Sequence, residues 1–228
     1  MFEIIKSGGW LMAPLVLCSV AVVAIVAERL WTLQTRRVAP EHLAAQVWNW
    51  LKSGELDEER LQALRAGSPL GRILAAGLEQ RRAPREVMNE AIEDTGRHVV
   101  HELDRYLITL GTVATISPLL GLLGTVLGII HVFAAISTAG LGNPAALASG
   151  ISQALITTVA GLTVAIPAYI LYRYLRGRVD ELVDRMEQET TRLMNAVRGA
   201  ETGLDAEAAA EPPVAAIARA AKPRKARA

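Results

Sequence analysis

The hydrophobic positions of this chain gather in two long runs that contain no charged residue. Residues 7–27 form the first run and residues 106–172 form the second. A helix needs roughly 20 mainly apolar residues to cross the hydrocarbon core of a bilayer. The longer run divides at residues 137–144, where Gly, Asn and Pro favour a turn. The pattern therefore predicts three membrane-spanning helices, near residues 8–27, 106–136 and 150–173.

Outside these runs, apolar residues recur at the spacing of a helix. One mostly apolar stripe runs without a breaker into the second span, through Met88, Ile92, Thr95, Val99 and Leu103. A similar stripe extends the third span through Leu175, Val179, Leu182, Met186, Leu193 and Val197. Pro40, Pro69 and Pro84 stand just inside the start of helical patterns, and Ser68 is a suitable N-cap. We therefore expect an all-α integral membrane protein with long helical extensions.

This pattern predicts six segments along the chain. They are an N-terminal end with the first membrane helix (1–35), a helical segment (36–105), the second membrane helix (106–136), a turn (137–149), the third membrane helix with its extension (150–198) and a tail (199–228). The tail is rich in Ala, Glu and Pro and ends in a basic stretch, so we expect it to be disordered. That basic end either touches anionic lipid or only keeps the tail solvated.

The basic residues predict how the helices are oriented. Residues 28–105 contain twelve Lys and Arg, the chain after residue 172 contains eleven, and residues 137–149 contain none. The positive-inside rule then places the N-terminus outside and both charged segments in the cytoplasm. A cleaved signal peptide is an alternative for the first run. Its charged start is weak and Ile25 fits a small-residue cleavage pattern poorly, so a retained anchor is favoured.

Charge and cysteine content exclude several classes of function. The net charge is +1, and residues 28–105 balance twelve basic against thirteen acidic residues, so no nucleic-acid-binding surface is expected. Cys18 is the only cysteine, which rules out a disulfide framework and a cysteine-based metal site. The sequence has no phosphate-binding loop and no metal-spaced cluster. We therefore expect no enzyme, no cofactor and no metal.

Polar residues inside the spans are the candidates for chemistry. They are Thr109, Thr112, Thr115, Ser117 and Thr125 in the second span, and Ser152, Gln153, Thr157, Thr158 and Thr163 in the third. Hydroxyl and amide groups are costly in hydrocarbon, so these faces should meet protein or water. The alternative is that each hydroxyl bonds back to a carbonyl one turn earlier. His131 is either a proton relay or an interfacial residue at a helix end.

The uncharged runs also limit how ions could cross. Neither run contains a carboxylate, the group that ion sites in membranes normally include. If ions cross here, the acidic group must come from another chain. Small residues suited to close helix packing are Gly121, Gly124, Gly128 and Gly161, and Pro118 and Pro167 can kink their helices.

Three stretches resemble the MotA/TolQ/ExbB proton-channel family, most closely its ExbB branch. The first combines residues 9–14 with residues 28–31, the second is residues 118–128, and the third is residues 150–162 with 164–167. The resemblance implies a bacterial inner-membrane pentamer of this chain. The ring would surround single-span ExbD-type or TolR-type subunits, each bearing one essential Asp. It would drive a TonB-like or TolA-like transducer.

The same resemblance implies roles for particular residues. Thr125 and Thr158 match family threonines, and we expect them to face the pore and bind the partner's Asp or nearby water. Thr157 and Gln153 complete the candidate ion pathway. Many members carry Glu at the position of Gln153, so a protonation step there is in doubt. Gln153 could still orient water or join subunits.

Several functions therefore stand as hypotheses. The first is a ring subunit of a motor that uses the proton-motive force to energise outer-membrane import. A TolQ-like subunit of the Tol-Pal envelope system and a non-conducting scaffold are alternatives. A secondary transporter is disfavoured because three spans show neither an internal repeat nor a charged binding residue. The ion is taken as H⁺ by resemblance, with Na⁺ as the alternative.

Overall fold

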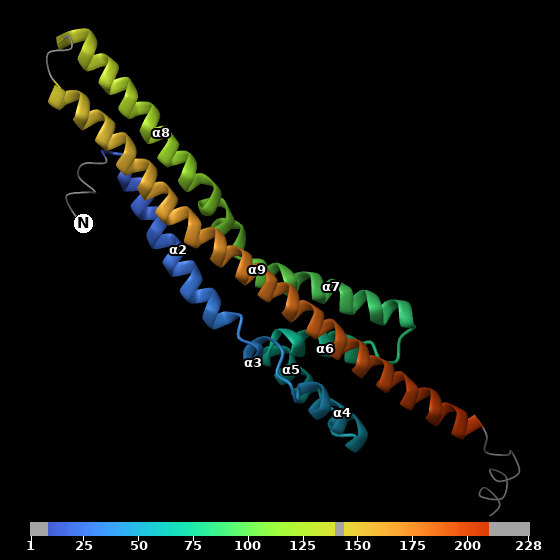
Figure 1. Cartoon of the computed structure of the whole chain (residues 1–228). Helices are drawn as coiled ribbons and strands as arrows, with labels where there is room; N and C mark the ends of the chain where they lie inside the picture. The colour runs from blue at the N-terminus through green and yellow to red at the C-terminus, as the bar shows by residue number, and fades with distance from the viewer. Residues whose placement is uncertain (1–8, 140–143, 210–228) are drawn as a thin grey trace, which may run out of the picture. The chain divides into compact units, whose positions relative to one another are not determined.

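The computed structural model describes residues 9–139 and 144–209, and within these ranges it contains helices and no strand. The helices shown in Figure 1 are α2 (Met12–Thr32), α3 (Thr35–Val38), α4 (Leu43–Ser53), α5 (Glu58–Gly67), α6 (Pro69–Glu79), α7 (Arg85–Asp104), α8 (Leu107–Ala139) and α9 (Pro144–Ala209). The expected all-α fold is confirmed.

The chain divides into two compact units. Unit 1 joins the residues up to Val38 with His98–Val183, and unit 2 joins Ala39–Arg97 with the residues from Asp184 onward. The long helices α7 and α9 contribute residues to both units.

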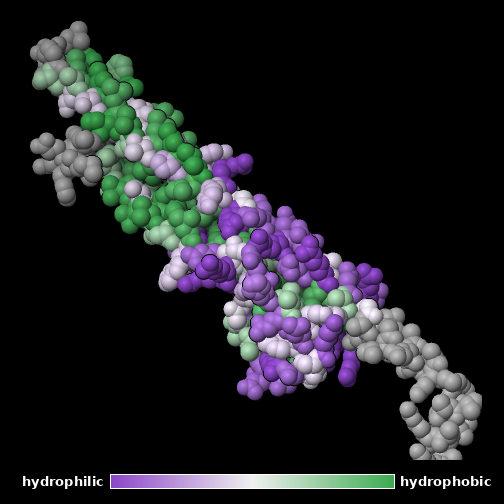
Figure 2. Space-filling view, turned by 60° about the horizontal axis from the view of Figure 1, so that its bottom comes forward, coloured by the Kyte–Doolittle hydropathy of each residue, from purple (hydrophilic) through white to green (hydrophobic). Residues whose placement is uncertain are grey.

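Unit 1 contains the membrane-crossing part of the protein. Among the described residues, three helical stretches are long and apolar enough to span a bilayer: Met12–Thr32, Arg85–Ser137 and Leu147–Gly199. Large side chains point away from the protein on these helices, for example Leu17 at 72% and Ile108 at 74% exposure. Hydrophobic residues cover this part of the surface in Figure 2. Exposed apolar area costs about 25 cal/mol per Å² in water, so these faces require lipid or other protein chains.

One expectation about the second span is wrong. The apolar stripe predicted an unbroken helix from residue 88 into the span, but α7 ends at Asp104 and α8 begins at Leu107. Between them Tyr106 has a φ of +65°, in the left-handed region. The sequence has no Gly or Pro here, so the break has a tertiary cause. Arg29 of α2 donates hydrogen bonds to carbonyl groups at the end of α7.

The structure also differs from the sequence-based expectation at the C-terminal end of α9. The helix was expected to end near residue 198 and give way to a disordered tail, but α9 continues to Ala209. Ala and Glu dominate residues 200–209, and both are strong helix formers. The rest of the tail, including its basic end, lies outside the described residues.

Unit 2 has a small core centred on α6. Leu70, Leu74 and Leu78 of this helix are fully buried. A Cβ placed on Gly77 would lie 2.9 Å from Sδ of Met194 in α9 and 3.0 Å from Cδ1 of Ile92 in α7. The amphipathic face of α6 therefore packs against both long helices within this unit, as its apolar spacing requires.

Short polar contacts define where the helices of unit 2 begin. Ser68 caps α6 as expected: its Oγ accepts a hydrogen bond from the backbone N–H of Gly71 at 3.0 Å, and Pro69 is the first residue of the helix. Pro40 and Pro84 precede α4 and α7, which differs from their expected place inside the first turn. The carbonyl of Pro84 accepts from the N–H of Met88, which places Pro84 at the cap position of α7.

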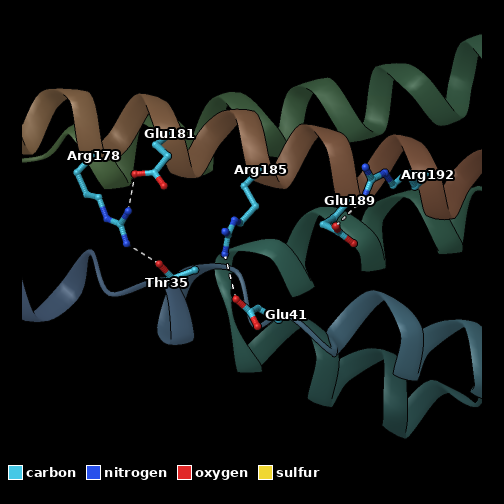
Figure 3. Close-up of polar contacts among 7 residues, drawn as sticks. All are labelled: Thr35, Glu41, Arg178, Glu181, Arg185, Glu189 and Arg192. Atoms are coloured by element: carbon cyan, nitrogen blue, oxygen red, sulfur yellow. Dashed lines mark hydrogen bonds and ion pairs between the residues drawn. The ribbon is translucent and has the colours of Figure 1, made fainter.

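Ion pairs and charged hydrogen bonds join the polar parts of the helices (Figure 3). In unit 1, Arg178 of α9 donates to the hydroxyl of Thr35 at 2.5 Å and pairs with Glu181. In unit 2, Arg185 pairs with Glu41 over 3.6 Å. Exposed pairs of this kind contribute about 0–1 kcal/mol each to the free energy of unfolding, so they add to the stability of the fold but do not determine it.

Replacing the cap of α6 should weaken unit 2. Ser68→Ala removes the only side-chain oxygen that binds the N–H of Gly71 in the described cap, and loss of an N-cap costs about 1 kcal/mol. We expect a lower melting temperature for the purified protein in detergent. Ser53→Ala is the matched control, because that hydroxyl is exposed and bonds only to the Trp50 carbonyl in its own helix. Equal melting temperatures for the two variants would contradict the assignment.

Candidate functional site

The candidate site is built on a close contact between α8 and α9 in unit 1. The glycines of α8 lie directly against α9. A Cβ placed on Gly121 would be 3.2 Å from Cα of Thr158, and one placed on Gly128 would be 2.6 Å from Cβ of Ala154. From the other side, a Cβ on Gly161 would lie 2.6 Å from the carbonyl oxygen of Ser117. The helices therefore approach so closely that larger residues do not fit.

Thr157 lies inside this contact. It is 1% exposed, and a Cβ on Gly124 would overlap its methyl group. Its hydroxyl donates to the carbonyl of Gln153 at 2.8 Å. The structure thus places Thr157 between the two helices, where it packs against Gly124.

Thr158 forms a hydrogen bond between the helices. Its hydroxyl donates to the carbonyl oxygen of Gly121 at 3.1 Å, and the side chain is half-buried. Gly121 and Thr125 are one turn apart on the same face of α8. Thr158 therefore lies on the side of α8 that carries Thr125, and the structure brings these two candidate residues to one region.

Thr125 is satisfied within its own helix. Its hydroxyl donates to the carbonyl of Leu122 at 2.6 Å, and the side chain is half-buried. A hydroxyl has one donor and two acceptor lone pairs. Since Thr125 and Thr158 both use their protons internally, what they can offer to a ligand is an acceptor oxygen. Water, or a carboxylic acid in its protonated form, could donate to these oxygens.

Gln153 occupies a different place from the two threonines. Its side chain is half-buried, and a Cβ on Gly9 would overlap its amide nitrogen. Gly9 has a φ of +75°, which a residue with a Cβ rarely adopts. The Gln153 amide therefore packs closely against the backbone just before α2, in the same chain.

Most other hydroxyls in the spans bond back to their own helix. The pattern holds for Thr112 and Thr115, which are exposed, and for Ser117 and Thr163. Each donates to the carbonyl four residues earlier, at 2.7–2.9 Å. The alternative reading of these residues from the sequence is thus the observed one. A threonine that is satisfied in this way can face lipid at little cost, so the polar pattern alone does not mark a pore.

The other candidate residues are two prolines within the long helices and one exposed histidine. Pro118 and Pro167 lie inside α8 and α9, which both continue past them. His131 is exposed on α8. Among the described residues no group of three or more His, Cys, Asp or Glu could hold a metal ion.

Sequence reasoning overlooked one residue of this unit. Arg29 was counted only among the basic residues that orient the first span, but the structure buries it to 3% exposure. A charged residue that directly follows a long uncharged helix is a signal that it has partners, although the carbonyl that Arg29 binds is 74 positions away in the sequence.

Comparison with known proteins gives the family. The model of the MotA/TolQ/ExbB proton channel family matches residues 65–188. The match includes all of α8 and the part of α9 up to residue 188. The chain belongs to this family. Thr125 and Thr158 both lie within the matched region, and so do the glycines of the α8 and α9 contact.

Several curated proteins with similar sequences agree with this family. A putative biopolymer transport protein ExbB homolog of Methanothermobacter thermautotrophicus is 32% identical over 187 residues, which are 81% of this chain and 66% of the relative. A putative ExbB-like protein of Synechocystis is 36% identical and covers 78% of this chain and 71% of its own length. A Tol-Pal system protein TolQ of Haemophilus influenzae is 43% identical over a shorter stretch, 36% of each chain. The chain is therefore a multi-pass membrane protein of a proton-channel family.

Enlarging a glycine of the helix contact should destabilise unit 1. In Gly161→Ala the added methyl meets the backbone of Ser117 and Gly121, which cannot rotate away, and overpacking costs about 1–3 kcal/mol. We expect a lower melting temperature. Gly177→Ala is the control: it lies in the same helix with open space around its Cβ position, and alanine favours helix there. A Gly161→Ala variant as stable as Gly177→Ala would overturn the proposed packing.

Proposed function

We propose that this chain is a ring subunit of an inner-membrane motor of the ExbB-ExbD-TonB type, which uses the proton-motive force to energise outer-membrane import. Family membership supports the channel class. The observation that carries the mechanism is the absence of any Asp, Glu, Lys or Arg from residues 106–172, the stretch that contains α8 and the apolar part of α9. A proton path along these helices needs a carboxyl group, so a partner chain must supply it.

The proposed partners follow from this need. The companion is a single-span ExbD-like subunit with an Asp in its membrane helix, held inside a homo-oligomeric ring that we take to be a pentamer. The transducer is TonB-like. The N-terminus lies in the periplasm and the C-terminus in the cytoplasm, as the distribution of arginines favours. No nucleic acid, metal or cofactor takes part.

Thr125 and Thr158 have the chemistry for the passage of a proton past the ring. Each can accept a hydrogen bond from the protonated Asp of the companion, while neither competes for its proton, because a hydroxyl is a far weaker base than a carboxylate. The acid would thus be held in place in its neutral form. Thr157 supports this region from α9 by packing against Gly124, and Gln153 packs against the backbone before α2; neither is proposed as a proton carrier.

The energy available to such a motor is adequate. One elementary charge that crosses 100 mV releases about 2.3 kcal/mol. Several protons in a cycle could therefore move a partner helix against a load of a few kcal/mol.

Two other functions are kept as alternatives. A TolQ-like subunit of the Tol-Pal envelope system is favoured by the TolQ relative, which is 43% identical in the part that aligns. A non-conducting scaffold is favoured by the hydrogen bonds that satisfy the span hydroxyls within the chain. The TolQ-like subunit differs from the proposal in the protein that it drives. The scaffold differs in that it conducts no protons.

Removing the two hydroxyls tests the mechanism. We expect Thr125→Val and Thr158→Val to reduce proton flux and energised uptake at least tenfold while the complex still assembles, since valine keeps the shape but cannot accept a hydrogen bond. Thr125→Ser and Thr158→Ser retain the hydroxyl and should retain most activity. Thr112→Val, in α8 like Thr125, is the control, because it removes a hydroxyl that bonds back to its own helix. It should leave proton flux unchanged. The scaffold alternative gains if flux per assembled complex is unchanged in every variant.

The composition of the complex tests the proposal as a whole. Native mass spectrometry after gentle extraction through a tag on this chain should find five copies together with a small companion that carries an Asp in its only membrane helix. The identity of that companion separates the TonB-type load from the Tol-type load. A monomer or homodimer without such a companion would refute the motor.

A further inference from the structure

Among the described charged residues of unit 1, Arg29 is the most completely buried. It lies in the last turn of α2 and is 3% exposed. Its Nε is 2.8 Å from a carboxylate oxygen of Glu28, which is itself partly exposed. A buried guanidinium is costly unless it is paired and hydrogen-bonded, and Nε forms this ion pair without a hydrogen bond among the described residues, so the Nη groups need partners.

Those partners are at the end of α7. Nη1 of Arg29 lies 3.1 Å from the carbonyl oxygen of Leu103 and 3.4 Å from that of Glu102. The last carbonyl groups of a helix have no donor within the helix, and the negative end of the helix dipole attracts a cation. The backbone N–H of Arg105 donates to the Glu102 carbonyl at 3.3 Å, and Arg29 adds a side-chain donor from another helix to this end of α7.

One residue between α7 and α8 has an unusual backbone. Tyr106 has a φ of +65°, and the guanidinium of Arg29 lies 5.2 Å from the centre of its ring. Arg105 stacks on the same ring at 4.9 Å. A left-handed conformation is unfavourable for a residue with a Cβ, and glycine is the residue that usually adopts it at a helix end. Contacts outside the local sequence must hold Tyr106 in this state.

An ion pair also restrains the segment between α7 and α8. Asp104, the last residue of α7, pairs with Arg176 of α9 at 2.7 Å. This pair is partly exposed, and Arg176 also lies 3.6 Å from Asp180, so the pair holds Asp104 less firmly than Arg29 holds the carbonyl groups. Among the described residues near the break between α7 and α8, Arg29 is the buried charged residue.

We infer that Arg29 is a positioning residue that maintains the break between α7 and α8. It does so by occupying the carbonyl groups of Glu102 and Leu103 and by holding Tyr106 in the left-handed conformation. The break fixes the direction in which α8, which carries Thr125, enters the span. Without Arg29, residues 104–107 should join α7 and α8 into the continuous helix that their side-chain pattern favours. This inference goes beyond the proposed function and does not depend on it.

The distance between two spin labels tests this inference. Cysteines at His101 and Leu119, both exposed and eighteen residues apart, are labelled in a Cys18→Ser background. Labelled chains are diluted with unlabelled ones so that a complex carries one labelled chain. In a continuous helix the two backbone positions would lie about 27 Å apart, at about 1.5 Å per residue. We expect a shorter distance in the parent protein and a shift toward this value in Arg29→Gln.

A glycine at position 106 distinguishes positioning from general stability. Glycine adopts the left-handed backbone without strain, so the double variant Arg29→Gln/Tyr106→Gly should recover the parent distance. The double variant Arg29→Gln/Tyr106→Ala also loses the tyrosine ring, but alanine is still strained in the left-handed backbone. This variant should therefore not recover the parent distance. Arg36→Gln, an exposed arginine in α3, should leave the distance unchanged.

The result that overturns the inference is equally clear. An unchanged distance in Arg29→Gln would show that the break does not need Arg29, and equal behaviour of the two double variants would show that Tyr106 is not held by it. If Arg29→Gln yields no folded protein, recovery of folded protein by Tyr106→Gly and not by Tyr106→Ala supports the inference, and failure of both refutes it. The distance measurement does not require ion flux, so its result is independent of the test of the proposed function.

Discussion

The close approach of α8 and α9 is the interaction on which the rest of unit 1 depends. Glycines on both helices remove the side chains that would hold the backbones apart, and Thr157 fills the space that Gly124 leaves. In a membrane the hydrophobic effect does not drive helices together, so this packing and the hydrogen bond from Thr158 to the Gly121 carbonyl have to supply the association. The positions of Thr157 and Thr158 follow from this contact.

That contact determines what chemistry the chain can offer. The hydroxyls of Thr125 and Thr158 donate inside the chain and keep only their acceptor lone pairs for a ligand. A surface of acceptors without any carboxylate can orient a proton donor but cannot carry the proton itself. The chain is therefore suited to be one half of an ion path, and the family to which it belongs is one of proton channels.

Arg29 has a structural role that the distribution of charges along the sequence does not reveal. Arg29 reaches from the end of the first span to carbonyl groups at the end of α7, where it replaces the glycine that usually ends a helix in this way. A buried cation held by backbone carbonyls is sensitive to the direction of the helix that presents them. Such a contact makes the start of the second span depend on the end of the first.

The sequence by itself determined the three spans, the helical character of the remaining chain and the Ser68 cap, because each of these depends on neighbours within a few residues. It also determined that no carboxylate lies within residues 106–172. Only the tertiary structure decided that α7 and α8 are separate helices, that Thr157 packs inside the helix contact and that Thr158 bonds across it. The partners in these cases are far along the chain, 74 positions for Arg29 and Leu103 and 37 for Thr158 and Gly121. Local periodicity carries no information about such pairs, since it records which face of a helix is apolar and not which helix will meet it.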